Sequence, residues 1–263
     1  MNLNGKRALL TGASGGIGHA IARRLAAGGV KLTLTGRRAE VLEPLAAQLD
    51  AEVLPADLAD REQLDRLLAQ CEEVDLLVAN AALPGSGRLS TLSTLDIDRA
   101  LDVNLRAPIV AARRLAPLMA ARGGGHIVLI SSISGKTSTP GTSIYNATKF
   151  GLRGFGLSLR AELRQQNVGV TTVFPGFISD AGMFADTKIE LPPGLSTRTP
   201  DQVADAVVRG IEQNKGELDV APVAIRLGAA IAGFAPETAS RISRIGGAEK
   251  ISMQFEERQS DKR

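Results

Sequence analysis

The sequence predicts an α/β fold, a doubly wound parallel sheet with helices on both faces. Short apolar runs alternate with amphipathic helical stretches along most of the 263 residues, which is the pattern of parallel strands joined by crossover helices. A glycine-rich turn joins the first apolar run to the first helical stretch. No repeat or domain boundary is visible. We therefore expect one domain over residues 1–221, with a substrate loop at 177–199, and a helical C-terminal extension of that domain over 222–263.

The composition favours a globular protein without a nucleic-acid partner. Hydrophobic residues make up 44% of the chain, which is enough for a sizeable core. Aromatic residues make up only 3%, with no tryptophan, whereas surfaces that stack nucleic-acid bases need aromatic platforms. The net charge of +3 is interspersed along the chain, so no charged block indicates an interaction tail.

The single cysteine and the length of the apolar segments indicate the cellular compartment that we expect for the protein. Cys71 has no partner for an internal disulfide, which favours a reducing compartment. The first residues lack the apolar region of a signal peptide, and no stretch reaches the ~18 apolar residues that a membrane span needs. We therefore expect a cytoplasmic protein with no integral membrane span, and we identify no metal site.

The first strand is expected at residues 7–11 and the first helix at 17–27, with a turn that contains Gly12, Gly16 and Gly18 between them. Glycines permit a tight turn and a close backbone approach to a pyrophosphate, and the helix N-terminus supplies free N–H groups. The alternative is a glycine-rich hairpin without a ligand.

The second strand, at residues 31–35, ends at Gly36-Arg37-Arg38. Dinucleotide-binding folds that bind NAD place an acid about here, ~20 residues past the glycines, to bond the ribose 2′-hydroxyl. That acid is missing. Arg37 and Arg38 suit a 2′-phosphate instead, which indicates NADP(H) rather than NAD(H), and Ser14 could share the phosphate. The alternative is two solvated arginines at a helix start.

A helix at residues 40–49 and a strand at 51–56 lead to Asp57 and Leu58. The Asp57 carboxylate could accept a hydrogen bond from an adenine amine, or it could cap the helix that starts near Arg61, and both can hold.

The next strand, at residues 74–78, ends in a stretch of small residues that contains Asn80 and Ala81 and would let the backbone pass close to a cofactor. A long helix at 96–119 follows. It carries Asn104 in its middle, where Asn has mediocre helix propensity. Asn104 is therefore either exposed by chance or has a polar task inside the protein.

The strand at residues 126–130 delivers Ser132, and the helix at 143–166 carries Tyr145 and Lys149. Four residues apart, Tyr145 and Lys149 lie on one helix face. An ammonium beside a phenol should lower the phenol pKa from its ordinary ~10, and a phenol tuned in this way can exchange a proton near neutral pH. The alternative is an ordinary surface pair.

The strand at residues 168–174 is closed by Pro175 and Gly176, and an irregular loop follows. A helix at 201–214 and a strand at 216–221 complete the sheet. The loop region is rich in apolar side chains, which either line a substrate pocket or pack the loop down. These side chains are Ile178, Met183, Phe184, Ile189 and Leu191.

The tail contains an apolar segment at residues 223–234 and two further helical stretches at 240–247 and 249–259. It could be a packing or dimer element, a cap near the substrate mouth, or a weak peripheral membrane contact.

With these motifs in place, residues 5–220 resemble the short-chain dehydrogenase/reductase family, in its NADP-preferring form. The resemblance rests on motifs in the family's order: the glycine turn, the Asn80-Ala81 pair, a catalytic tetrad and the Pro175-Gly176 turn. The tetrad positions are Asn104, Ser132, Tyr145 and Lys149. Ser132 is preferred to Ser131 because it lies thirteen residues before Tyr145, a spacing that the family commonly uses.

The resemblance implies a Rossmann fold and hydride transfer between NADP(H) and a small-molecule carbonyl/alcohol pair. It implies that Ser132 and Tyr145 bond the carbonyl oxygen, that Lys149 holds the nicotinamide ribose and that Asn104 anchors a water. It places Ile17 and Leu58 among the cofactor contacts, with the Ile178 backbone on the carboxamide. Asp180 replaces a threonine of the family, so we transfer no contact to it.

We therefore expect an NADP(H)-dependent oxidoreductase that acts on an apolar, lipid- or steroid-like substrate and forms a homodimer or homotetramer. Two alternatives stay open, an NAD-linked alcohol dehydrogenase of the same family and a non-catalytic NADP(H)-sensing protein. The long tail differs from the short ending of bacterial 3-oxoacyl-carrier-protein reductases, which disfavours that activity.

Overall fold

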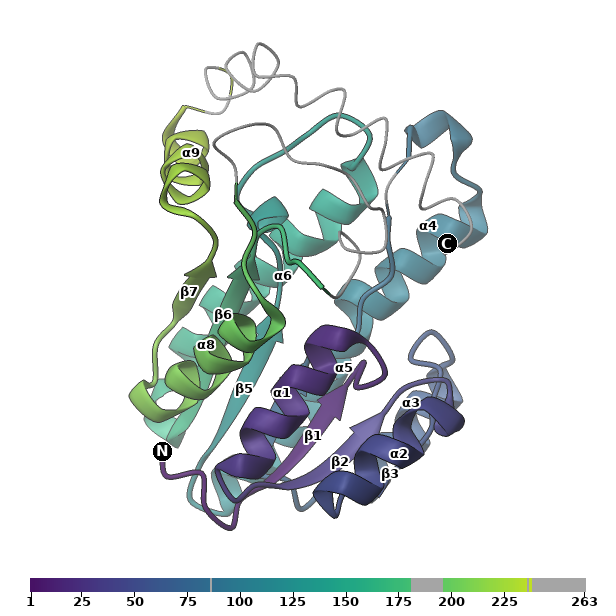
Figure 1. Cartoon of the computed structure of the whole chain (residues 1–263), viewed down its shortest axis with the longest axis vertical. Helices are drawn as coiled ribbons and strands as arrows, with labels where there is room; N and C mark the ends of the chain where they lie inside the picture. The colour runs from purple at the N-terminus through teal and green to yellow at the C-terminus, as the bar shows by residue number, and fades with distance from the viewer. Residues whose placement is uncertain (86, 181–195, 236, 238–263) are drawn as a thin grey trace.

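A computed structural model of the chain describes residues 1–85, 87–180, 196–235 and 237. Within these residues seven strands form one sheet in the order β3-β2-β1-β4-β5-β6-β7, and every neighbouring pair is parallel. Figure 1 shows the sheet with helices packed against it. The predicted doubly wound α/β fold is confirmed.

The strands occupy nearly the predicted positions. They are β1 (Arg7–Thr11), β2 (Lys31–Thr35), β3 (Glu52–Val53), β4 (Leu76–Ala79), β5 (Gly125–Ile130), β6 (Val168–Pro175) and β7 (Glu217–Val220). Side chains alternate between the two faces of a strand, so Leu9 and Leu10 belong to different hydrophobic clusters.

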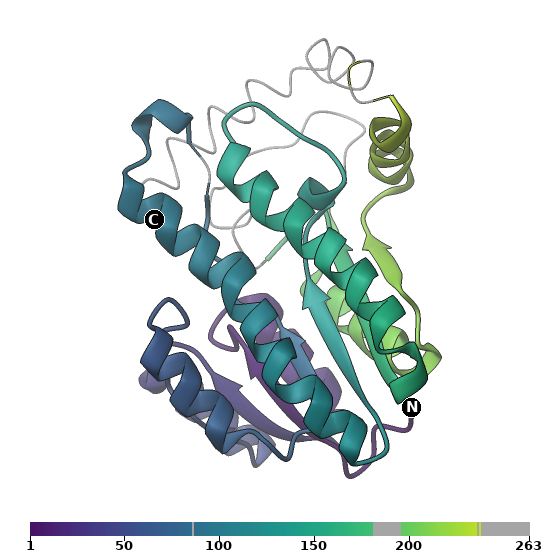
Figure 2. The ribbon, with the colours of Figure 1, turned by 180° about the vertical axis from the view of Figure 1, so that it is seen from behind.

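In the described part of the chain, three helices cover one face of the sheet and three cover the other. The first face carries α1 (Gly16–Ala27), α2 (Ala39–Leu49) and α8 (Pro200–Gln213), whose buried side chains share one cluster. The opposite face carries α3 (Arg61–Gln70), α5 (Ala107–Ala121) and α6 (Ser143–Glu162). Figure 2 shows α5 and α6 lying across the second face. Both faces of the sheet are therefore covered, as parallel sheets require.

Three element boundaries differ from the prediction. The third strand is shorter, at Glu52–Val53, although the N–H groups of Leu54 and Ala56 still donate to the carbonyls of Leu34 and Gly36 at 3.0 and 3.1 Å. The long helix divides into α4 (Thr94–Leu101), a π-helical turn at Asp102–Arg106 and α5. The helix that carries Tyr145 ends at Glu162, after which the chain passes through a 3₁₀ turn (Arg164–Gln166).

The site is set by the topology. β1 lies between β2 and β4, where the strand order reverses. Ligands of doubly wound sheets bind in the crevice at the carboxyl ends of the strands at such a switch point. The glycine turn after β1, Asn80 after β4, Ser132 after β5 and Gly176 after β6 all lie at this edge.

The described part of the tail is the helix α9 (Val223–Phe234). The helical stretches expected at 240–247 and 249–259 lie outside the described residues, as does most of the loop at 177–199. No helix in the described ranges is long and apolar enough to cross a membrane.

Candidate active site

Tyr145 and Lys149 lie one turn apart on α6, as their spacing predicts. The Lys149 ammonium lies 5.5 Å from the centroid of the Tyr145 ring. Only 1% of Lys149 is exposed, and its Nζ donates a 3.1 Å hydrogen bond to the carbonyl of Ile130, at the end of β5. An ammonium has three donors. One N–H donor thus fixes the side chain, and the other two can bind a ligand.

The pKa values of this pair differ from the expectation. Burial raises the pKa of Tyr145 to about 12, although the hydrogen bond with Ser132 opposes the rise. Burial also lowers the pKa of Lys149 to about 8. The prediction that Lys149 holds the phenol pKa below its ordinary value is therefore wrong for the chain without ligand, because desolvation dominates. At neutral pH both groups are protonated, so the phenol has a proton to donate.

Ser132 begins a 3₁₀ turn (Ile133–Gly135) directly after β5. Its side chain bonds Tyr145 and also accepts a 3.1 Å hydrogen bond from the backbone N–H of Ser134. Ser131 points elsewhere, since its hydroxyl donates to the carbonyl of Lys149 at 3.0 Å. The hydroxyl beside the phenol is thus that of Ser132, the residue that the spacing selected.

Asn104 has a polar task inside the protein and is not exposed by chance. It is buried within the π-helical turn. Its Oδ1 accepts a 2.7 Å hydrogen bond from the N–H of Leu83, and its Nδ2 donates to the Leu83 carbonyl at 2.9 Å. The side chain therefore clamps the segment after β4 onto the helix beside α6. Its expected role as a water anchor stays a prediction.

The glycine turn forms a cradle with no room for a side chain at Gly12 or Gly18. Gly12 has φ +65°, and a Cβ there would lie 2.6 Å from the Cα of Ala81. A Cβ on Gly18 would lie 2.4 Å from the Gly12 carbonyl oxygen. Gly16 and Ile17 open α1, and Gly15, which precedes them, provides no side-chain cap. The first N–H groups of this helix are therefore available to an anion.

Thr11 and Asn80 hold the cradle in place. The Thr11 hydroxyl oxygen accepts hydrogen bonds from the N–H groups of Asn80 and Ala81 at 3.0 and 3.1 Å. In return the Asn80 amide donates to the carbonyls of Thr11 and Gly12 at 3.1 and 3.0 Å. The Asn80 side chain thus shapes the glycine turn, and what it leaves for a cofactor is the backbone of this stretch.

Arg37 and Arg38 are both exposed at the start of α2. Neither guanidinium group has a hydrogen-bond or ion-pair partner among the residues that the structure describes. Ser14 lies over Gly36, since a Cβ on Gly36 would lie 3.1 Å from the Ser14 hydroxyl oxygen. The exposed residues Arg37 and Arg38 and the Ser14 hydroxyl thus all follow or adjoin the carboxyl end of β2, where a dinucleotide places its adenosine ribose.

Asp57 follows β3 but does not cap α3. Asp60 caps it, by accepting from the N–H groups of Glu62 and Gln63. Asp57 instead accepts 3.0 Å and 3.2 Å hydrogen bonds from the N–H of Ala59 and from Arg99 of α4. The capping alternative for Asp57 is therefore wrong, and Arg99 is a partner that the sequence did not indicate.

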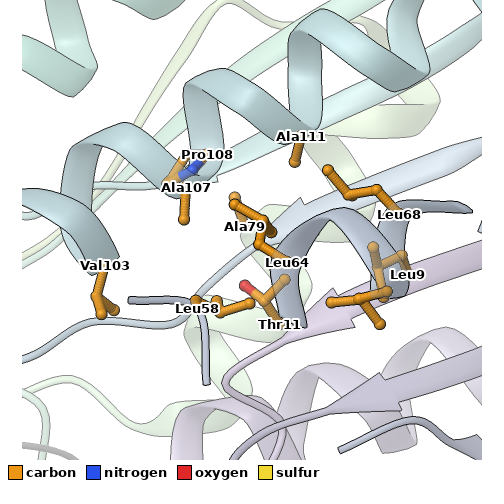
Figure 3. Close-up of a pocket in the computed structure, with 11 residues that line it drawn as sticks. Leu9, Thr11, Leu58, Leu64, Leu68, Ala79, Val103, Ala107, Pro108 and Ala111 are labelled. Carbon is orange, nitrogen blue, oxygen red and sulfur yellow. The ribbon is translucent and has the colours of Figure 1, made fainter. Parts of the chain in front are cut away.

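Leu58 is buried and points into a narrow apolar pocket between the sheet and the helices α3 and α5 (Figure 3). The lining includes Leu64, Ala79 and Ala107, which belong to the hydrophobic core of this face. The pocket thus lies in the core, away from Tyr145, and the Leu58 side chain is part of that core.

Pro175 and Gly176 end β6, and the Gly176 N–H donates to the Val220 carbonyl at 3.0 Å. On either side of Ile178, Phe177 and Ser179 pair with the backbone of Arg198 at 2.8 Å each. Ile178 itself makes no backbone hydrogen bond with the residues that the structure describes, so its N–H and C=O face away from this pairing. Its side chain is 3% exposed and packs in the core. Ile178 is therefore not part of a pocket wall.

The crevice fits a dinucleotide on its own geometry. The glycine turn packs its backbone so closely that Gly12 and Gly18 leave no room for a Cβ, the first N–H groups of α1 follow the turn without a side-chain cap, and the Ile178 backbone makes no hydrogen bond with the described residues. The side chains that would act on a carbonyl, Ser132 and Tyr145, lie at this same edge of the sheet.

A family model described as short chain dehydrogenase matches residues 6–191. The chain belongs to the short-chain dehydrogenase/reductase family. It is an NAD(P)-dependent dehydrogenase/reductase, and the family acts on small-molecule substrates.

Three relatives of this short-chain dehydrogenase/reductase illustrate the match. "Nodulation protein G" of Rhizobium sp. (strain N33) is 44% identical over 68% of this chain and 76% of its own. "Ketoacyl reductase HetN" of Nostoc sp. (strain PCC 7120) is 35% identical over 83% of this chain and 79% of its own. The structure titled "Short-chain dehydrogenase from Sphingobium yanoikuyae in complex with NADPH" superposes with a TM-score of 0.78 at 28% identity, covering 89% and 95% of the two chains.

Proposed function

We propose that this enzyme uses NADP(H) to reduce the carbonyl group of an apolar ketone to an alcohol. The observation that carries the proposal is the protonated Tyr145 phenol, bonded to Ser132 and backed by the Lys149 ammonium. This arrangement offers two hydroxyl donors to one carbonyl oxygen and a proton to the alkoxide that develops there.

In this mechanism Ser132 and Tyr145 orient the carbonyl oxygen by hydrogen bonds and stabilise its developing negative charge. When bound in the crevice, the nicotinamide cofactor supplies the hydride. Tyr145 gives its proton to the oxygen, and the positive charge of Lys149 stabilises the phenolate that remains. The remaining Lys149 donors would hold the ribose, and the Ile178 backbone the carboxamide. Asn104 and Asn80 keep the segments around the site in place.

The preference for NADP(H) is supported by the free guanidinium groups of Arg37 and Arg38 beside Ser14. Their bidentate donors suit the 2′-phosphate that distinguishes NADPH from NADH. The NADPH complex of the Sphingobium yanoikuyae relative adds support. The adenine would lie near Asp57 and Leu58, and the pyrophosphate at Gly12, Gly16, Ile17 and Gly18.

Titration of the purified protein with NADPH and NADH, followed by cofactor fluorescence, tests this preference. We expect tighter binding of NADPH. Arg37→Asp should weaken NADPH binding by about tenfold to a hundredfold and leave NADH binding nearly unchanged, since each charge-assisted hydrogen bond to phosphate contributes ~1.5–3 kcal/mol. Equal affinity of the wild type for the two cofactors would contradict the proposal and favour NAD-linked alcohol oxidation.

The apolar substrate is supported by the relative named as a ketoacyl reductase. Met183, Phe184, Ile189 and Leu191, the other apolar residues of the predicted pocket wall, lie outside the described residues. A series of 2-alkanones from butan-2-one to decan-2-one tests this point with NADPH. We expect kcat/KM to rise with chain length by up to about fourfold per methylene, which corresponds to ~0.8 kcal/mol for each buried methylene. No rise would exclude an apolar pocket, and no reduction of any ketone would favour the NADP(H)-sensing alternative.

We also propose that the enzyme is a cytoplasmic homodimer or homotetramer of the single domain 1–221 with its extension 222–263. The oligomer is supported by apolar side chains exposed on α4 and α6, namely Leu101, Phe150 and Leu157. A mass measurement by light scattering tests it, and a monomer at micromolar concentration would exclude it.

A further inference from the structure

A cluster of charged side chains lies beside the active site, along β7 and near the carboxyl end of β6. Its centre is Lys136, whose side chain is only 12% exposed. The Lys136 ammonium pairs with Asp219 at 2.7 Å and with Glu217 at 3.1 Å, both on β7. It also lies 4.0 Å from the centroid of the Phe174 ring. One cation thus contacts two carboxylates and an aromatic face, a set that fixes its position from several sides.

The same cluster reaches the helix that carries Tyr145 and Lys149. Arg153 lies one turn beyond Lys149 on α6 and forms a bidentate pair with Glu217, at 2.7 and 3.3 Å. Burial works to raise the pKa of Glu217, but the hydrogen bonds and charges of Arg153 and Lys136 outweigh it and hold the pKa below its ordinary value. Glu217 is therefore ionised at neutral pH and links α6 to the Lys136 ammonium.

Lys136 also ends the turn that begins with Ser132. The Gly135 N–H donates to the Ser132 carbonyl at 2.8 Å, and the Lys136 N–H donates to the Ile133 carbonyl at 2.9 Å. Gly135 packs tightly on α6, because a Cβ there would lie 2.7 Å from the Lys149 carbonyl oxygen. A shift of the Lys136 side chain would therefore move a short turn that is rigidly linked to Ser132.

We propose that Lys136 is a positioning residue, whose ammonium ties the Ser132 turn to β7 and α6 and so aligns the Ser132 hydroxyl with the Tyr145 phenol. The proposal rests on the proposed reductase function, but its geometry can be tested without turnover. Lys136 touches neither Ser132 nor Tyr145 through its side chain. It acts through the turn and through Glu217 and Arg153.

A spectroscopic test is available because Tyr145 is the only tyrosine and the chain has no tryptophan. The ultraviolet absorption and emission of the protein at neutral pH therefore report the hydrogen bonding of one phenol. Lys136→Met, which keeps most of the stem and removes the charge, should shift both spectra toward those of Ser132→Ala. Lys136→Arg should stay close to wild type, because it keeps a cation in reach of both carboxylates.

The kinetic test uses NADPH and the 2-alkanone that the wild type reduces fastest. Lys136→Met should lower kcat by about tenfold to a hundredfold, the loss expected when a reacting group is misplaced by about 1 Å, while the Kd for NADPH stays within about twofold. In a Ser132→Ala background, Lys136→Met should lower kcat no further, because the residue through which it acts is gone.

The matched control is Lys6→Met. Lys6 pairs with Asp75 at 3.2 Å at the opposite end of the sheet, so its removal also breaks a lysine–carboxylate pair between strands but should leave the spectra and kcat unchanged. If Lys136→Met does not fold, Asp219→Asn replaces it. Unchanged spectra in Lys136→Met, or equal changes in Lys6→Met, would overturn the proposal. If the wild type reduces no ketone, the proposed function is refuted. The tyrosine spectra of Lys136→Met and Ser132→Ala then still test whether Lys136 positions Ser132.

Discussion

The Tyr145 hydroxyl is the group on which the proposed chemistry depends most directly. Tyr145→Phe keeps the ring beside Lys149 and removes the phenolic hydroxyl that interacts with Ser132. We expect kcat to fall by about a hundredfold to ten-thousandfold, the usual contribution of a positioned general acid, and the Kd for NADPH to change little. Steady-state kinetics with a cofactor titration on the same preparation measures both. Turnover at the wild-type level would remove Tyr145 from the mechanism.

At the residue scale, the sequence identifies the residues of the site but does not predict their pKa values. The spacing of Tyr145 and Lys149 predicts that they share a helix face, and they do. The sign of the Tyr145 pKa shift depends on burial by segments distant in the chain, and spacing cannot show burial. In the same way, the sequence allows Asp57 as the cap of α3, and the backbone geometry places Asp60 there instead.

At the element scale, the glycine turn predicts that an alanine will destabilise the protein at a helical position where helix propensity alone would favour it. Gly18 lies within α1, where alanine is normally favoured by about 1 kcal/mol. A Cβ there would meet backbone atoms, the Gly12 oxygen at 2.4 Å and the Ala13 Cα at 2.8 Å. Gly18→Ala should therefore destabilise the protein by ~1–3 kcal/mol and weaken NADPH binding by at least about tenfold, as measured by urea unfolding and cofactor fluorescence.

Gly15→Ala is the matched control in the same turn. Its nearest neighbour would be 3.7 Å from the new Cβ, and its φ of −89° suits any residue. It should therefore bind NADPH within about threefold of wild type, a change of less than ~1 kcal/mol. If both substitutions weaken binding equally, close backbone packing is not what requires glycine at position 18.

Periodicity predicts most elements to within a few residues, because their burial patterns are strong. It misses the π-helical turn at Asp102–Arg106, because the sequence continues to look helical through it. The bonds that accompany the turn join Asn104 to Leu83, in another element. Lys136 and Arg99 were missed for the same reason, since their partners lie far away in the chain.

At the scale of the whole molecule, His126 couples stability to pH. It lies 2% exposed at the start of β5, at the end of the sheet opposite Ser132. Its Nε2 is 2.8 Å from the Thr171 hydroxyl, which donates its own proton to the Lys215 carbonyl at 2.6 Å. The Thr171 oxygen must therefore accept from His126, which fixes a neutral ring with the proton on Nε2. Burial, with Arg160 and the N-terminus nearby, lowers the His126 pKa to about 3.

A histidine whose pKa is lowered by folding stabilises the folded state fully above its unfolded pKa of ~6.5. That contribution is lost as the pH falls from there toward 3. For His126 alone the free energy of unfolding should fall by ~2 kcal/mol between pH 7 and pH 5, since one pKa unit corresponds to 1.36 kcal/mol. His126→Gln keeps an N–H donor but does not titrate. Urea unfolding at pH 7, 6 and 5 should therefore show a decline in its free energy of unfolding that is smaller by about this amount.

The protein has two histidines, and partly exposed His19 is the control, because burial and Arg23 also lower its pKa. If His19→Gln flattens the decline and His126→Gln does not, the buried pair of His126 and Thr171 is not the source of the acid sensitivity.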